Sequence, residues 1–159
     1  MSPPELDWDY PDPFVIEHTA EKSEVDGYGH INNSVYVQWM DRCVWAHCEA
    51  VGLGFEVCQG LKRGFAAIRH EIDYLLATYE GDEVSIANWV TLNDGRLRAE
   101  RRFQIIRHSD NKTVLRAHSK YICTSLATGM PSRIPEEFNE GFCVLPSVAQ
   151  ALLGSKTTR

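Results

Sequence analysis

Apolar and polar positions repeat with two different periods along this chain, and the change of period separates a helix from strands. From Tyr36 onward, apolar and aromatic side chains recur every three or four residues, which is typical of an amphipathic helix. Asn32 or Asn33 is a suitable N-cap, and Gly52 provides a C-terminal stop. The pattern predicts a helix over about residues 34–51.

Strand-like alternation at period two occurs on both sides of this helix. The segments are residues 14–25, 66–76, 84–92, 97–108 and 114–125. Short polar turns separate the last four, and the Asp94-Gly95 pair is a strong hairpin signal. Consecutive tight turns predict that these four strands form an antiparallel meander.

A sheet with one apolar face needs a cover, and the apolar side of the helix is the obvious one. The order of elements therefore predicts an α+β fold, in which an antiparallel sheet of about five strands wraps around one long central helix. We expect a single domain over residues 1–159, with its core at about 14–135. An extended lead-in rich in proline precedes this core, and a tail follows it with a short helix at 147–153.

Composition narrows the range of partners. The net charge of −6 and the pI of about 5.5 argue against nucleic acid as a partner. No apolar run is long enough to span a bilayer, and the N-terminal residues do not resemble a signal peptide. The five cysteines are odd in number and lack CxxC spacing. We therefore expect reduced thiols in a cytoplasmic protein, with no metal site and no cofactor.

Candidate chemistry is concentrated just before the helix. Asp26 is followed by Gly27, Gly29, His30 and two asparagines, and the helical pattern then begins at once. This order places an acid beside the amide-rich, positive end of a helix, which can polarise a carbonyl group. An acid that faces a polarised carbonyl is a plausible hydrolase site.

The segment 26–39 resembles the signature of 4-hydroxybenzoyl-CoA thioesterase-like acyl-CoA thioesterases, in the hotdog-fold superfamily. The matching positions are Asp26, Gly29, Tyr36 and Trp39, and the Gly-His-Ile-Asn-Asn run is similar to a common variant of the motif. Weaker similarities lie at residues 69–74, 81–83 and 127–131, so that the resemblance covers about residues 14–135.

The resemblance implies hydrolysis of an acyl-CoA thioester with Asp26 as the catalytic carboxylate. It also implies a homodimer or homotetramer with sites at the subunit interface. One departure matters: some members carry histidine seven residues after the aspartate, where this chain has Asn33. A mechanism that uses an imidazole at that position does not carry over, and the acyl group is not inherited with the motif.

The chemistry assigns roles to the residues of this segment. Asp26 can attack the thioester directly or activate a water as general base, and the sequence does not separate these roles. Its other interpretation is an acid that caps the loop. Backbone amides near the helix start can stabilise the oxyanion. His30 either takes part in catalysis or braces the loop. The expected substrate-binding residues, of which at least one asparagine caps the helix, are Asn32, Asn33, Ser34, Val35 and Tyr36.

Other candidate residues favour structural roles. His70 lies between Ile68 and Ile72 in the alternation, which predicts a hydrogen-bonded core histidine. The helix aromatics and Met40 can line an acyl pocket, but packing against the sheet is the stronger expectation. Basic residues on the last two strands can meet CoA phosphates or form a solvated face balanced by acids, and they are Arg101, Arg102, Arg107, Arg116 and Lys120.

Three functions compete on this fold. The first is an acyl-CoA thioesterase. The second is a non-catalytic module that binds or senses acyl-CoA, against which the presence of Asp26 argues. The third is a related hydratase or dehydratase, whose usual histidine-containing motif this chain lacks. A dinucleotide-binding loop is rejected, because the Gly27-x-Gly29 pair has no third glycine.

Overall fold

The fold is built on a β-sheet. The computed structural model describes residues 5–156. One five-stranded antiparallel sheet has the order β1-β3-β4-β5-β2. Its strands are β1 (Phe14–Thr19), β2 (Arg63–Tyr74), β3 (Glu83–Asn93), β4 (Arg98–Arg107) and β5 (Lys112–Ser125). Strands β1 and β2 are thus the two edges of the sheet.

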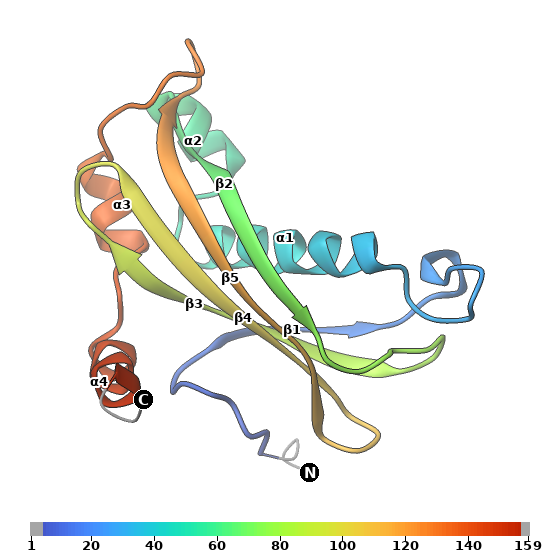
Figure 1. Cartoon of the computed structure of the whole chain (residues 1–159). Coiled ribbons are helices and arrows are strands. Elements are labelled where there is room, and N and C mark those ends of the chain that lie inside the picture. The colour runs from blue at the N-terminus through green and yellow to red at the C-terminus, as the bar shows by residue number, and fades with distance from the viewer. Residues whose placement is uncertain (1–4, 157–159) are drawn as a thin grey trace.

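The long helix α1 (Asn33–Ala50) lies across one face of the sheet, which curves around it (Figure 1). Trp39 and Cys43 of α1 are fully buried and pack with Ile86 and Ile105 of the sheet in the main apolar core. Burial of such side chains supplies about 1.5–3 kcal/mol each. The predicted α+β architecture, with a sheet wrapped around one central helix, is confirmed.

The prediction of a four-strand meander is wrong for β2, the first of the four strands. Strands β3, β4 and β5 do form consecutive hairpins, but β2 pairs with β5 instead of β3. Residues 75–82 form no tight hairpin: they carry the chain from the edge strand β2 to β3, which lies next to the other edge strand, β1 (Figure 1). On the way, the carbonyl of Thr78 accepts a hydrogen bond from the amide of Ile31 at 2.9 Å. The crossover therefore supports the segment that precedes α1.

The alternation read along β2 also breaks. A β-bulge shifts the register between Ala67 and Arg69, so the inward-facing positions change from odd to even numbers. Phe65 lies inward before the bulge and Ile72 after it. This single bulge explains why unbroken alternation from 66 to 76 misassigned the first half of the strand. The first predicted strand is likewise shorter than expected, because a 3-10 turn, η1 (Lys22–Glu24), follows β1.

Two short helices were not anticipated. Helix α2 (Phe55–Leu61) follows α1, and α3 (Glu136–Gly141) follows the sheet. They bury Cys58 and Phe138 in a second apolar cluster at the far end of α1. The tail helix is present as α4 (Pro146–Lys156). Within residues 5–156, no helix has the length and apolar character needed to cross a bilayer.

Candidate functional site

The Asp26 loop is a compact turn closed by its own backbone. The amide of Asp26 donates to the carbonyl of His30 at 2.7 Å, and the amide of Gly29 donates to the carbonyl of Asp26 at 3.1 Å. Gly29 has a φ of 82°, a left-handed conformation that suits glycine. This geometry explains why glycine stands at that position. It also holds the half-buried Asp26 in a defined place.

The two carboxylate oxygens of Asp26 have different environments. Oδ1 accepts hydrogen bonds from the amides of Tyr28 at 2.8 Å and His30 at 3.3 Å. Oδ2 accepts none from the described part of the chain. The loop-capping interpretation is therefore realised by one oxygen, and the other is free to face a reactant. The same side chain can be both anchored and reactive.

Glu24 ties this loop to the core. Its Oε2 accepts a 2.7 Å hydrogen bond from Nε1 of Trp39, and its Oε1 lies 2.9 Å from Nε2 of His18. Its backbone carbonyl accepts from the amide of Asn32 at 2.9 Å. Burial raises the pKa of Glu24, but hydrogen bonds from His18, the Glu21 backbone and Trp39 together lower it below its ordinary value. Sequence reasoning missed this residue, although an acid two positions before Asp26 was a visible signal.

The start of α1 is capped from within. Oδ1 of Asn32 accepts from both the amide and the hydroxyl of Ser34, at 3.0 and 2.9 Å, and the Asn32 carbonyl accepts from the amide of Val35 at 2.9 Å. Asn32 is thus the N-cap, as one expectation held. The amide of Asn33 has no acceptor among residues 5–156. Of the amides at positions 33–35, it is the one left open to a ligand.

The remaining predicted site residues divide by exposure. His30 is exposed, and its ring packs edge-on against Tyr79 with 5.3 Å between centroids. Its backbone braces the loop, whereas its imidazole has no hydrogen bond within the described chain. Val35 and Tyr36 are buried in the core, and burial raises the pKa of the Tyr36 phenol. Ser34 is exposed at the helix start.

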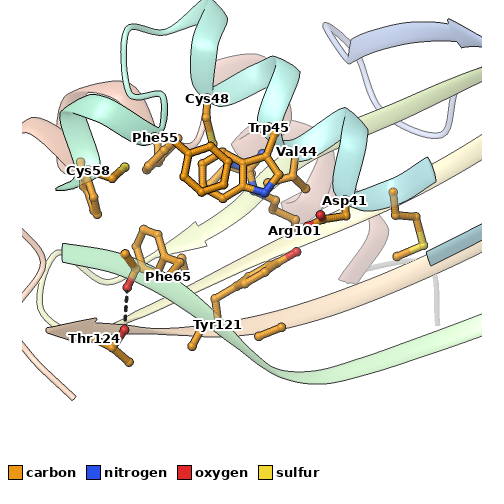
Figure 2. Close-up of a pocket in the computed structure, with 18 of the residues that line it drawn as sticks. Asp41, Val44, Trp45, Cys48, Phe55, Cys58, Phe65, Arg101, Tyr121 and Thr124 are labelled. Carbon is orange, nitrogen blue, oxygen red and sulfur yellow. Dashed lines mark hydrogen bonds between the residues drawn. The ribbon is translucent and has the colours of Figure 1, made fainter. Parts of the chain in front are cut away.

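A large cavity lies beside these residues. It has a volume of about 670 Å³ and extends between α1 and strands β2, β4 and β5. Its lining begins at Val37 and Gln38, one turn after the helix start, and includes Met40. Residues 26–36 do not line it. Figure 2 shows this cavity, in whose wall Trp45 stacks on Phe55 with ring centroids 3.8 Å apart. We call this space the α1 cavity.

Arg101 lines this cavity and is buried, which the sequence did not predict. The side chain was expected among basic residues of a solvated face or a phosphate-binding surface, but it is only 6% exposed. Strand alternation explains why Arg101 is buried. Its side chain lies on the same face of β4 as the buried residues Ala99 and Phe103. Arg107 and Arg116, by contrast, form ion pairs with Asp110 and Asp9, which agrees with a balanced face.

A buried polar cluster surrounds Arg101. Its Nη1 donates to Oδ1 of Asn88 and lies 2.8 Å from Nδ1 of His47. Because a guanidinium only donates, Nδ1 of His47 is an acceptor and the imidazole is neutral. Burial and the Arg101 charge lower the pKa of His47 to about 4. The neighbouring Cys43 thiol receives a hydrogen bond from Nδ2 of Asn88, yet burial raises its pKa to about 11. Cys43 is therefore no nucleophile at neutral pH.

His70 also departs from its predicted place. It is exposed at the edge strand, where it lines the α1 cavity, so the expectation of a core residue is wrong. The expectation of a satisfied ring is confirmed, because Nδ1 lies 2.6 Å from Oγ of Ser119. Trp39 and Tyr36 pack as expected. All five cysteines are free thiols. No group of metal-binding side chains occurs in the described part of the chain.

Comparison with known families identifies the superfamily of this chain. Residues 21–142 match the model of the thioesterase-like superfamily. This range contains the Asp26 loop, α1 and all strands except β1. The chain therefore belongs to the thioesterase-like superfamily, whose members are hydrolases of thioester bonds. No protein of curated function matches the sequence.

Solved structures show the same hotdog fold. A 1,4-dihydroxy-2-naphthoyl-CoA thioesterase from Synechocystis is 15% identical with a TM-score of 0.74, and the match covers 83% of this chain and 96% of that one. A Staphylococcus aureus protein in complex with CoA is 15% identical with a TM-score of 0.75, covering 82% and 81%. An acyl-ACP thioesterase from Bacteroides thetaiotaomicron is 24% identical with a TM-score of 0.67, covering 74% and 48%.

Proposed function

We propose that the protein is an acyl-CoA thioesterase that hydrolyses its substrate to a free acid and CoA, with Asp26 as the catalytic carboxylate. The observation that carries this proposal is that the two carboxylate oxygens of Asp26 have different environments. Two backbone amides fix Oδ1, while Oδ2 has no partner in the described chain. A carboxylate held on one side and open on the other is oriented for attack or for proton abstraction.

Two routes use this oxygen. In the first, Oδ2 attacks the thioester carbon, CoA leaves as the thiolate, and water then hydrolyses the mixed anhydride. In the second, Oδ2 takes a proton from a water molecule as that water attacks the carbon. A single turnover in ¹⁸O-labelled water identifies the first route when water attacks the aspartyl carbon of the anhydride. Label in the Asp26 carboxylate, read by peptide mass spectrometry, indicates the first route.

The oxyanion needs a donor, and we assign this role to the amide of Asn33. The amides of Ser34 and Val35 are already bonded to Asn32, whereas that of Asn33 is open. Its position at the N-terminus of α1 adds the positive end of the helix dipole. Loss of one such donor costs about 10²–10³ in turnover in a hydrolase that has been studied in this way. Asn32, Ser34, Val35 and Tyr36 support the site by capping and packing.

The α1 cavity is the proposed place for the acyl group. It is lined mainly by apolar side chains, and its lining begins one turn after the helix start. A volume of about 670 Å³ is within the range of small-molecule sites. A thioester carbonyl near Asn33 would direct its acyl group along α1 into this space.

Assembly into a homodimer or homotetramer is also proposed, with the edge of β2 as the contact. This strand pairs on one side with β5 and has no strand partner on the other within residues 5–156. Ile68 on this edge is 51% exposed. Exposed edges invite pairing with another chain. We place the reaction in the cytoplasm, where five free thiols are expected to persist.

The test is a panel of short, medium, long and aromatic acyl-CoA thioesters, read by release of free thiol. We expect turnover of at least one class by the wild-type protein. Asp26→Asn should lose at least about a hundredfold in kcat while its circular dichroism spectrum and unfolding midpoint stay close to wild type. Glu80→Gln, an exposed acid in the turn before β3 and outside the α1 cavity, provides the matched control and should show that a general loss of charge is harmless.

Three outcomes would contradict the proposal. Near wild-type turnover by a folded Asp26→Asn protein would show that another group is the catalytic acid. Tight acyl-CoA binding without thiol release across the whole panel would identify the non-catalytic binding module instead. Activity on an enoyl thioester would point to a hydratase.

A further inference from the structure

Arg101 is a buried cation without a counter-ion. Among the described side chains, the ion pairs made by arginine involve Arg69, Arg107 and Arg116. No carboxylate pairs with Arg101, which is 6% exposed. A buried charge that is hydrogen-bonded but unpaired is costly, so its presence calls for an explanation.

One edge of the guanidinium is free. Both protein partners of Arg101, Asn88 and His47, are bonded through Nη1. Nε and Nη2 have no hydrogen-bond acceptor among the described residues, and the buried side-chain atoms without a partner do not include them. These atoms therefore retain contact with open space. Together, Nε and Nη2 form the edge of arginine that binds a carboxylate through two parallel hydrogen bonds.

The open space at this edge is the α1 cavity, because Arg101 is one of its lining residues. Figure 2 shows Tyr121 pointing its hydroxyl toward the part of the cavity where Arg101 lies. Phe142 packs against the guanidinium with its ring centre 5.4 Å from Cζ. The neighbouring walls include the apolar residues Val90 and Phe103, and Asp41 of α1 also lines the cavity and is drawn next to Arg101 in Figure 2, although no ion pair joins the two side chains. The cavity thus combines an apolar passage with one polar end.

We propose that Arg101 binds a terminal carboxylate on the acyl group, so that the substrate class is an ω-carboxyacyl thioester. This inference rests on the proposed function for the position of the thioester, but not for the binding of a carboxylate at Arg101. A monocarboxylic acyl chain would bring only its methyl end to a cation that is desolvated and unpaired. An ω-carboxylate supplies the missing counter-ion.

The helix sets the length scale. Arg101 contacts His47, which follows Asn33, the proposed oxyanion donor at the start of α1, by 14 positions. At a rise of about 1.5 Å per residue this distance is roughly 20 Å. An extended chain advances about 1.2 Å per bond, so acyl groups of about 12–16 carbons fit the span. We expect the preference for a terminal carboxylate to be greatest in this range.

The test uses CoA thioethers, which cannot be hydrolysed, so that binding is measured apart from catalysis. S-dodecyl-CoA and S-(11-carboxyundecyl)-CoA form one matched pair, and shorter and longer pairs complete the series. Binding is measured by titration calorimetry. We expect the carboxylated thioether to bind at least about tenfold more tightly at one or more lengths. Arg101→Gln should abolish this preference, while Arg98→Gln, an exposed arginine on the same strand, should retain it.

Equal or tighter binding of the alkyl thioether at every length in the wild-type protein would overturn the proposal. A preference that persists in folded Arg101→Gln would also overturn it. If Arg101→Gln does not fold, Arg101→Lys keeps the charge but lacks the two-donor edge, and a clearly reduced preference is expected. Failure of thiol release with an intact carboxylate preference would refute the proposed hydrolysis alone, since the thioethers report binding only.

Discussion

Trp39, in the core of the molecule, donates a 2.7 Å hydrogen bond from Nε1 to Oε2 of Glu24. This contact joins the fully buried middle of α1 to the turn that leads into Asp26. The position of the candidate catalytic acid is therefore set by the packing of the core as well as by its own loop.

Removal of Glu24 should loosen this connection. We expect Glu24→Ala to lower the free energy of unfolding by about 1–3 kcal/mol, because it leaves the buried indole N–H of Trp39 without an acceptor. Glu24→Gln retains an acceptor and should cost less. Urea denaturation measures the effect. Glu140→Ala, an exposed acid on α3, should change stability by less than about 0.5 kcal/mol. Equal stability of Glu24→Ala and wild type would show that the hydrogen bond between Trp39 and Glu24 does not stabilise the fold.

His47 should make stability depend on pH. Its pKa falls from an ordinary 6.5 to about 4 on folding, so between these values the unfolded chain binds more protons. The contribution of His47 to the free energy of unfolding is fully present above about pH 6.5 and is lost as the pH falls toward 4. Because the imidazole ring is only partly buried, we expect this contribution to the free energy of unfolding to be about 1–2 kcal/mol. Urea denaturation from pH 4.5 to 7.5 should show a shallower slope for His47→Gln than for wild type, and identical slopes would refute the assignment.

The thiols should differ sharply in reactivity. Cys143 is exposed, whereas the other four cysteines are buried, and burial raises the pKa of Cys43 and Cys48 to about 11. We expect a thiol reagent to modify one cysteine rapidly in the native protein and all five after denaturation. Cys143→Ser should remove the rapid reaction. This variant is also the better protein for assays that detect released CoA thiol. Rapid modification of two or more native thiols would contradict this burial pattern.

The free edge of β2 should carry the subunit contact. We expect Ile68→Asp to weaken the assembly, because it places a charge on an exposed apolar position of the unpaired strand. Leu92→Asp changes a similarly exposed apolar residue of β3 and serves as the control. Analytical ultracentrifugation reports the mass of each. A monomeric wild-type protein, or an oligomer unaffected by Ile68→Asp, would refute this interface.

Much of the fold could be predicted because periodicity reports burial directly. The helix around Trp39 and the hairpins beside Gly95 follow from local patterns, and both are present. The partner of β2 could not be predicted in this way, because strand order depends on contacts far apart in sequence. The bulge at Ala67 is a related case, since an extra residue in one strand leaves no clear trace in composition.

The candidate site was predictable only in part. Asp26 and the cap at Asn32 follow from a local motif, and the structure gives each a defined geometry. Arg101 was visible as a basic residue, but its burial depends on the phase of β4 relative to α1. A charge inside the fold contradicts the usual hydrophobic pattern, so pattern reasoning assigns it to the surface. Such exceptions are expected where a ligand supplies the missing partner.

The place of β2 in the sheet has a consequence for how the chain folds during synthesis. Tyr74 pairs with Leu115 and Arg63 with Ser125, so β2 leaves the ribosome well before the strand that will hold it. Until β5 emerges, α1 can settle only on an incomplete sheet. Such long-range pairing is slow to form, because a large loop must close before its contacts are gained. The walls of the α1 cavity are completed only by β5, the last strand to be made, and by Phe138 and Phe142 after it, so the cavity can bind a ligand only late in synthesis.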